Sequence, residues 1–256
     1  MLKIHTIPAF RDNYFWLFHE VGDSRGWVVD PGADEPVEAA LEAHGLTLAG
    51  ILVTHHHADH TGGVAALAKR HGARVIGPVS DQFRAVDETV REGDRVICAG
   101  CEFEVIEVPG HTLDHIAYHC ASEQVLFCGD TLFAGGCGRL FEGTAVQMHG
   151  SLGKLAALPE ATKVFCAHEY TLANLAFAVR VEPDNTVLAE RLAAARRSRE
   201  ADVPTVPSTV GLERATNPFL RSAAPAVIAA AEQRAGHSLT APEDVLAEVR
   251  RWKDAS

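Results

Sequence analysis

A histidine-rich segment directly after an apolar run constrains this chain more than any other feature. Residues 49–54 have the composition of a buried strand, and four of the next six residues are histidine. Side chains alternate along an extended segment, so His55 and His57 point the same way. The adjacent residues Asp59 and His60 diverge from each other for the same reason. Because no single regular element brings these side chains onto one ion, the segment indicates two groups of metal ligands.

Two divalent metal ions fit this spacing better than one. In sites where two ions lie about 3.5 to 4 Å apart, each ion has its own ligands. We expect one ion to bind His55 and His57. We expect its neighbour to bind Asp59 and His60. A surface histidine patch is the alternative, but the apolar strand before the segment and the Gly62-Gly63 helix start after it would fix the ligand geometry.

Three further candidate ligands follow predicted strands later in the chain. They are His111, Asp130 and His168, at the ends of predicted strands over residues 103–108, 125–128 and 163–167. Ligands in α/β proteins bind beyond the carboxyl ends of strands. Each residue alone is more often a core or turn residue, but the shared position of all three supports a common site.

The organisation of the chain changes near residue 170. Residues 1–169 alternate short β-branched runs with amphipathic segments, which predicts an α/β fold of two packed sheets covered by helices. Further strands are expected at residues 26–29, 49–54, 74–77 and 116–119, and helices at residues 35–43, 63–71 and 144–158. Residues 170–256 are rich in Ala, Leu, Glu and Arg and predict a small α-helical C-terminal domain. Its helices are expected at residues 170–181, 185–201, 224–235 and 242–252.

Composition excludes several classes of function. The chain has 34 acidic and 23 basic residues and a formal net charge of −11, which argues against nucleic acid and anionic membranes as partners. No stretch approaches the roughly 18 to 20 consecutive apolar residues of a membrane span, and the first residues lack a signal-peptide pattern. We therefore expect a cytoplasmic protein. Six cysteines in apolar surroundings indicate buried thiols, with a redox or half-zinc role for Cys98 and Cys101 as the alternative.

The complete motif set resembles a known superfamily. The run His55-x-His57-x-Asp59-His60, followed by His111, Asp130 and His168, is similar to that of the metallo-β-lactamase superfamily. Its fold is an αββα sandwich with metals at one edge. Within it, the chain resembles the hydroxyacylglutathione hydrolase (glyoxalase II) family over nearly its whole length. The resemblance includes Asp12-Asn13-Tyr14, Gly135-Gly136-Cys137-Gly138-Arg139, His168-Glu169-Tyr170-Thr171, Asn217-Pro218-Phe219 and Arg250-Arg251-Trp252-Lys253.

The resemblance assigns ligands and substrate contacts. It implies one metal bound by His55, His57 and His111, a second bound by Asp59, His60 and His168, and Asp130 bridging both. It also implies that residues 1–169 are the catalytic domain and residues 170–256 the substrate-binding domain. Arg250 and Lys253 share a helix face, where they could meet the glycine carboxylate of glutathione. Arg139 and Tyr170 complete the pocket, and Phe141 stands where the family commonly has tyrosine.

Charge bookkeeping supports a hydrolytic centre. Two divalent cations bring about +4, two aspartates and a bridging hydroxide remove about 3, and the remaining positive charge activates water and stabilises an oxyanion. Asp59 is expected to hold the hydroxide as a catalytic residue as well as to bind metal. We expect zinc at both positions, with iron and manganese as alternatives.

The resulting prediction is a thioester hydrolase. It would convert S-D-lactoylglutathione and other S-2-hydroxyacylglutathiones to the 2-hydroxy acid and glutathione by attack of a metal-bridging hydroxide. The chain is expected to act as a monomer on this small-molecule substrate. A single-iron glutathione persulfide dioxygenase is the first alternative, and it would not need His60 and His168. A lactonase or β-lactamase, or a non-catalytic metal module with closed coordination, are the others.

Overall fold

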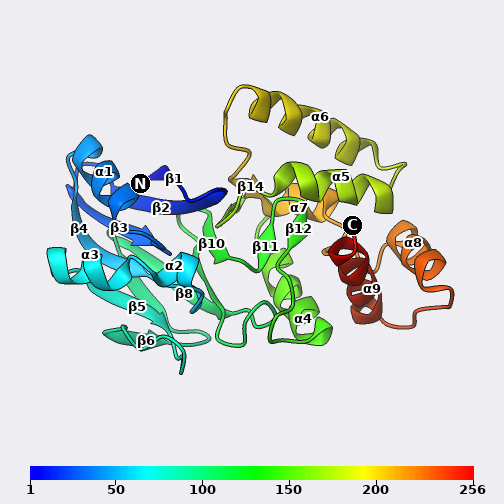
Figure 1. Ribbon diagram of the computed structural model, residues 1–256, viewed down its shortest axis with the longest axis horizontal. Helices are drawn as coiled ribbons and strands as arrows, with labels where there is room; N and C mark the ends of the chain where they lie inside the picture. The colour runs from blue at the N-terminus through cyan, green and yellow to red at the C-terminus, as the bar shows by residue number, and fades with distance from the viewer. The chain divides into compact units, whose positions relative to one another are not determined.

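The chain forms two compact parts. The computed structural model describes residues 1–256 (Figure 1). The first part consists of residues 1–107 and 114–129, and the second part of residues 108–113 and 130–256. The boundary near residue 170 was placed by a change in composition, and as a domain boundary it stays a prediction.

A mixed six-stranded sheet is the frame of the first part. Its strands lie side by side in chain order: β1 (Leu2–Ala9), β2 (Asn13–Glu20), β3 (Arg25–Val29), β4 (Thr47–Leu52), β5 (Arg74–Pro78) and β6 (Glu88–Val90). The first three strands are antiparallel, and β3 to β6 run parallel. Parallel neighbours need crossover connections. These contain α1 (Glu35–His44) between β3 and β4, and α2 (Ala58–Thr61) with α3 (Val64–His71) between β4 and β5.

A second, antiparallel sheet in the first part packs against this frame. It contains β7 (Arg95–Cys98), β8 (Cys101–Glu107), β9 (Ile116–Cys120) and β10 (Val125–Gly129). Three buried aromatic rings join the two sheets. The ring of Phe18 in β2 lies 5.5 Å from that of Phe103 in β8 and 5.2 Å from that of Phe127 in β10, measured between centroids.

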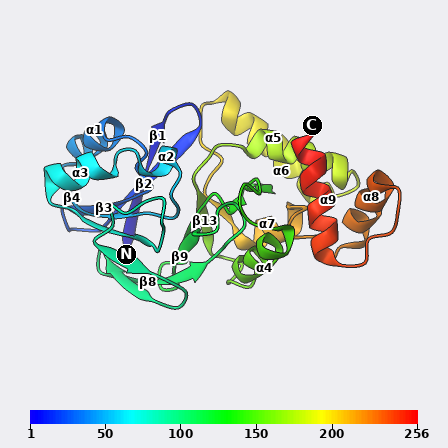
Figure 2. The same ribbon diagram turned by 60° about the horizontal axis from the view of Figure 1, so that its bottom comes forward.

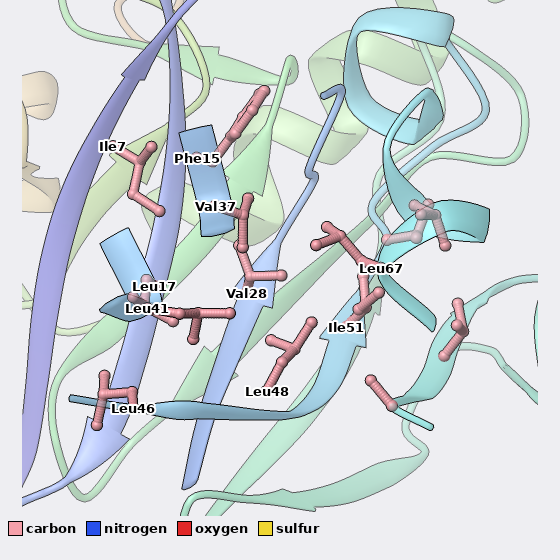
Figure 3. Packing of buried hydrophobic residues seen from close by; sticks show 14 of the residues in the cluster. Ile7, Phe15, Leu17, Val28, Val37, Leu41, Leu46, Leu48, Ile51 and Leu67 are labelled. Atoms are coloured by element: carbon pink, nitrogen blue, oxygen red, sulfur yellow. The ribbon is translucent and has the colours of Figure 1, made fainter. Parts of the chain in front are cut away.

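Helices α1 and α3 cover the other face of the six-stranded sheet. Val37 and Leu41 of α1 and Leu67 of α3 are almost completely buried against strand residues such as Val28 and Ile51 (Figure 3). The local sequence sets the ends of α1, because a proline lies in its first turn and Gly45 follows it in a left-handed conformation with φ 64°. The helices therefore close an apolar layer that the sheet alone would expose to water.

The second part is mainly helical. β11 (Leu132–Phe133) pairs with β12 (Gly136–Cys137), and β13 (Lys163–Cys166) pairs with β14 (Ser208–Thr209). The helices are α4 (Ala145–Ala156), α5 (Thr171–Val181), α6 (Thr186–Glu200), α7 (Val210–Thr216), α8 (Pro225–Ala235) and α9 (Pro242–Asp254). α5 lies beside α6, and α8 beside α9 (Figure 2). None of the helices combines the length and apolar character needed to cross a membrane.

The predicted α/β class and most predicted elements are confirmed. The four helices expected after residue 170 correspond to α5, α6, α8 and α9. The sequence patterns do not predict β1, β2, β6, β7, the two-residue strands, α2 or α7. β2 shows the reason, since its first six residues are all buried and the strand therefore lacks the alternation of a half-exposed one.

Two sequences in the chain, Thr144-x-x-Gln147 and Thr240-x-x-Glu243, have the spacing of a capping box, in which side chains at both positions accept hydrogen bonds from backbone N–H groups at a helix start. Their outcomes differ. At α4, the Gln147 backbone N–H donates to Thr144 Oγ1 (3.2 Å) and the Thr144 N–H donates to Gln147 Oε1 (2.9 Å), so this box is confirmed. The spacing of Thr240 and Glu243 also predicts a box, and that prediction is wrong. α9 begins one residue later, with Ala241 at the N-cap and Pro242 as its first residue, and no side chain caps it.

The cysteines are free thiols, as expected. Five of the six are buried, and Cys101 is half-buried. Cys98 and Cys101 pair directly across the turn between β7 and β8. Burial raises the pKa of both thiols, that of Cys101 to about 11, so both remain protonated at neutral pH.

A buried carboxylate holds the second part together, which leads to a stability prediction. Glu213 is fully buried, accepts hydrogen bonds from the Gly135 N–H (2.8 Å) and Asn217 Nδ2 (3.0 Å), and pairs with Arg191. Replacing Glu213 by Ala leaves the buried Arg191 charge uncompensated, so we expect a loss of about 3 to 5 kcal/mol in the free energy of unfolding, measured by urea denaturation.

The matched control removes an exposed carboxylate of the same part. Glu160 pairs with Arg214 at 3.2 Å, but its side chain is 74% exposed. We expect Glu160→Ala to cost less than about 1 kcal/mol. Equal losses in the two variants would contradict a structural role for the Glu213 network.

Candidate metal centre

Backbone packing fixes the histidine-rich segment at the end of β4. The segment leaves β4 and turns into the short helix α2, which carries Asp59 and His60. Gly32 lies directly under it. A Cβ at Gly32 would stand 1.9 Å from the carbonyl oxygen of Asp59, so only glycine permits this approach.

A buried aspartate orients two of the histidines. Asp30, which has φ 52°, accepts hydrogen bonds from the Thr54 N–H (2.7 Å) and the Thr54 hydroxyl (2.6 Å) through its two carboxylate oxygens. His60 Nδ1 donates to the same carboxylate at 3.1 Å. The Thr54 hydroxyl in turn lies 3.0 Å from His55 Nδ1. Because the hydroxyl proton goes to Asp30, His55 Nδ1 is the donor in this contact. Both rings therefore leave Nε2 as the nitrogen suited to bind a metal.

The predicted ligands of the first part come together in two pairs. His55 Nε2 lies 3.2 Å from His57 Nδ1, and His60 Nε2 lies 3.5 Å from Asp59 Oδ2. His55 and His60 are almost fully buried, whereas the Asp59 side chain is 44% exposed. Asn13 Nδ2 donates to Asp59 Oδ2 at 3.0 Å and holds the carboxylate in place.

The predicted ligands of the second part gather around one carboxylate. Asp130 Oδ2 lies 3.4 Å from His111 Nε2, and Asp130 Oδ1 lies 3.3 Å from His168 Nε2. All three side chains are less than a tenth exposed. His111 Nδ1 donates to the Arg139 carbonyl at 2.9 Å, which again leaves Nε2 for a metal. The two oxygens of Asp130 thus serve two different histidines, as a bridging carboxylate would.

The spacing of these atoms fits metal ligation. Ligands at about 2.0 to 2.1 Å from a tetrahedral metal lie about 3.3 to 3.4 Å from one another. The four distances given above, 3.2, 3.5, 3.4 and 3.3 Å, lie close to that value. Imidazole and carboxylate donors without cysteine suit zinc, iron and manganese. The convergence of the two groups on common ions stays a prediction, because they belong to different parts.

The predicted substrate residues all lie in the second part. Tyr170 stacks on the His168 ring, with centroids 4.7 Å apart, and Phe141 packs edge-on against His111 at 5.2 Å. Phe141 is 63% exposed and the Arg139 side chain 66%. Arg250 is only 4% exposed, and Lys253 is partly buried in the last turn of α9. The roles of all five residues in binding stay predictions.

Comparison with known proteins places the chain in a family. Residues 11–168 match the metallo-β-lactamase superfamily model, and residues 169–256 match the model of the hydroxyacylglutathione hydrolase C-terminus. The chain is 56% identical over 256 residues to a hydroxyacylglutathione hydrolase of Pseudomonas aeruginosa (strain LESB58), with 99% of each chain covered. It is 55% identical over 258 residues to that of Alkalilimnicola ehrlichii, with 100% of each covered. The chain belongs to the hydroxyacylglutathione hydrolase family.

Solved structures of lower identity share its fold. ETHE1 from Myxococcus xanthus is 24% identical, with a TM-score of 0.69 over 98% of this chain and 91% of its own. TTHA1623, solved in a di-iron-bound form, is also 24% identical, with a TM-score of 0.60 over 85% of this chain and 100% of its own. The predicted metallo-β-lactamase fold is thereby confirmed. The fold of this family and the His and Asp clusters together point to a dinuclear metal site.

Sequence patterns alone do not indicate the role of two residues beside the ligands. Asn13 belongs to the quoted Asp-Asn-Tyr motif, but only the structure shows its contact with Asp59. His115 stacks on His55 with ring centroids 4.5 Å apart and an interplanar angle of 16°. His56 instead pairs with Asp114 at 3.0 Å.

Asp30 provides the sharpest test of how this centre is held. Asp30→Asn keeps the size of the side chain and tolerates the positive φ, but an amide cannot replace both carboxylate acceptors of Thr54 and His60. We expect about a 10- to 100-fold loss of metal affinity, measured as metal content during titration with a chelator. Asp114→Asn is the control, because Asp114 pairs with a histidine outside the predicted ligand set. Wild-type metal retention by Asp30→Asn would contradict the proposed orientation of His60.

Proposed function

We propose that this protein hydrolyses the thioester bond of S-2-hydroxyacylglutathiones, such as S-D-lactoylglutathione, to give the 2-hydroxy acid and glutathione. The sequence motifs predict this activity, and relatives 51 to 56% identical over at least 99% of the chain confirm the enzyme class. The observation that carries the proposal is the spacing of the ligand pairs, which matches metal coordination in a chain of this family.

Seven side chains are proposed to hold two divalent ions. His55, His57 and His111 are proposed for one ion, Asp59, His60 and His168 for the other, and Asp130 for both. Two ions bound there would supply the acidity that makes water a nucleophile at neutral pH and the charge that stabilises an oxyanion. Zinc is proposed at both positions, with iron and manganese as alternatives, because imidazole and carboxylate donors suit all three metals.

Asp59 is the proposed catalytic residue of the chain itself. Its carboxylate is held by Asn13 yet remains 44% exposed, unlike the buried histidine His60 beside it. A carboxylate in this position can orient an attacking water by accepting its proton in a hydrogen bond. The leaving group is the thiolate of glutathione, which departs without a strong general acid, so no further acidic side chain is required.

The single-iron oxygenase reading has less support. It would need two histidines and one carboxylate. In this chain, buried Asp30 orients His60, and Asp130 lies beside both His111 and His168. These contacts orient more candidate ligands than the two histidines and one carboxylate that a single iron of this kind would use. The monomeric state and the cytoplasmic location stay predictions.

The direct test measures thioester hydrolysis together with metal content. Purified protein should remove the thioester absorbance of S-D-lactoylglutathione and contain about two metal ions per chain. Asp130→Ala should abolish turnover and lower metal content, because it removes the carboxylate beside both His111 and His168. Glu102→Ala, which removes an exposed carboxylate on β8, is the control. A wild-type protein with a single iron that consumes oxygen and leaves the thioester intact would overturn the proposal.

Phe141 allows a test in which binding improves. Its exposed ring lies against His111, and the family commonly has tyrosine at this position. A hydroxyl hydrogen-bonded to the glutathione backbone contributes about 0.5 to 1.5 kcal/mol. We therefore expect Phe141→Tyr to lower KM about 2- to 10-fold with little change in kcat, measured by steady-state kinetics. An unchanged KM would show that residue 141 does not contact the tripeptide.

A further inference from the structure

Three cationic side chains and one carboxylate gather at the end of α9. Arg250 Nη2 donates to Asp254 Oδ1 at 2.8 Å, and Arg139 Nε lies 3.6 Å from the same oxygen. Lys253 is next to Asp254 in the chain, and its ammonium group lies 5.4 Å from the centre of the Phe177 ring. Asp254 is therefore the only carboxylate that these contacts place among the three cations.

The buried guanidinium does not need Asp254 for its own position. Arg250 Nη1 also donates to the Cys137 carbonyl at 2.9 Å, and the guanidinium carbon lies 5.2 Å from the centre of the Phe219 ring. Its side chain is only 5% exposed. The Arg139 side chain is 66% exposed, and Asp254 is its ion-pair partner. Arg250 therefore has contacts besides Asp254 that fix its position, whereas Asp254 is the carboxylate that pairs with Arg139.

The location of Asp254 is unfavourable for the helix itself. An anion in the last turn of a helix faces the negative end of the helix dipole, where cations are preferred. Its side chain is 40% exposed and could turn to water. The two contacts with arginine compensate for this unfavourable position.

We propose that Asp254 is a positioning residue for the glutathione moiety, holding Arg139 beside Arg250 and Lys253 so that the three cations present one site for a substrate carboxylate. The inference rests on the proposed function, since it takes the glutathione moiety as the ligand. Glutathione carries two carboxylates and one ammonium group, a net charge of about −1 at neutral pH. A cluster with three cations and one anion has the opposite net charge and attracts it.

The protonation of Lys253 provides a second line of support. Burial, together with the charges of Arg250 and Arg139, lowers the pKa of Lys253 to about 8, while Asp254 and Cys137 act in the opposite direction. Binding of an anion needs the protonated amine, so its contribution is complete well below pH 8 and declines as the pH rises through that value. Removing the Asp254 charge lowers the pKa of Lys253 further, and the decline then begins at lower pH.

The test compares Asp254→Asn with two matched variants. Asp254→Glu keeps the charge, and Asp244→Asn makes the same charge change in the first turn of the same helix, away from the cluster. For Asp254→Asn we expect KM for S-D-lactoylglutathione to rise about 3- to 10-fold at pH 7, with kcat changed less than about 2-fold. Asp254→Glu should recover part of this loss, and Asp244→Asn should keep the wild-type KM.

A binding measurement separates this inference from the proposed function. Calorimetry with S-methylglutathione, which has no thiol to titrate, should show the alkaline loss of affinity beginning at lower pH in Asp254→Asn than in wild type. A lower KM in Asp254→Asn would mean that Asp254 competes with the substrate, and would overturn the inference. Wild-type KM and pH dependence would overturn it equally. Failure of the wild-type protein to cleave any glutathione thioester would instead refute the proposed function.

Discussion

The hydrogen bonds of the Asp30 carboxylate are the interactions on which the candidate metal ligands of the first part depend. It lies just after β3, binds the backbone and hydroxyl of Thr54 just after β4, and reaches His60 in α2. Two strand ends and one short helix are thereby fixed to a single buried group. An unpaired buried carboxylate is strongly unfavourable, so the three partners must be in place whenever this region is folded. The orientation of the candidate ligand nitrogens is thus set by the packing of the protein itself.

In the second part, too, a hydrogen bond to the protein orients a candidate ligand histidine, but the acceptor is a backbone carbonyl. His111 Nδ1 donates to the backbone carbonyl of Arg139, and Gly138 leaves room for this ring, because a Cβ there would lie 3.1 Å from His111 Nδ1 and 2.1 Å from the Asp130 carbonyl oxygen. A backbone carbonyl fixes the orientation of the His111 ring, whereas a network of side chains fixes that of His60. In both rings Nδ1 is a donor, which selects the tautomer in which Nε2 is free of a proton and suited to bind a metal.

The sequence suggests the candidate ligand residues, but it does not indicate most of the contacts that support them. Alternation in an extended segment groups His55 with His57, and the positions of His111, Asp130 and His168 after strands follow from local patterns. The expected divergence of Asp59 and His60 is wrong, because both lie in the short helix α2, where His60 Nε2 is 3.5 Å from Asp59 Oδ2. The same patterns do not predict strand β2, because it is buried on both faces and therefore lacks the alternation of apolar and polar residues. The contacts of Asn13 with Asp59 and of His115 with His55 join residues far apart in the chain. Both form only when the tertiary structure brings the residues together, so no local sequence pattern predicts them.

The electrostatics of the cluster around Asp254 depend on the contacts of each charged side chain as well as on which residues are present. The net charge of −11 repels an anionic substrate at long range, but salt screens such interactions beyond about 8 to 10 Å. Within that distance the nearby arginines and lysine around Asp254 determine the electrostatic interaction. Their effect depends on the partners of each cation as much as on the number of cations. Arg250 is buried and bound to the Cys137 carbonyl, whereas Arg139 and Lys253 have an environment that a single carboxylate can alter. The proposed binding site at the end of α9 therefore depends on the anion among the cations as well as on the cations themselves.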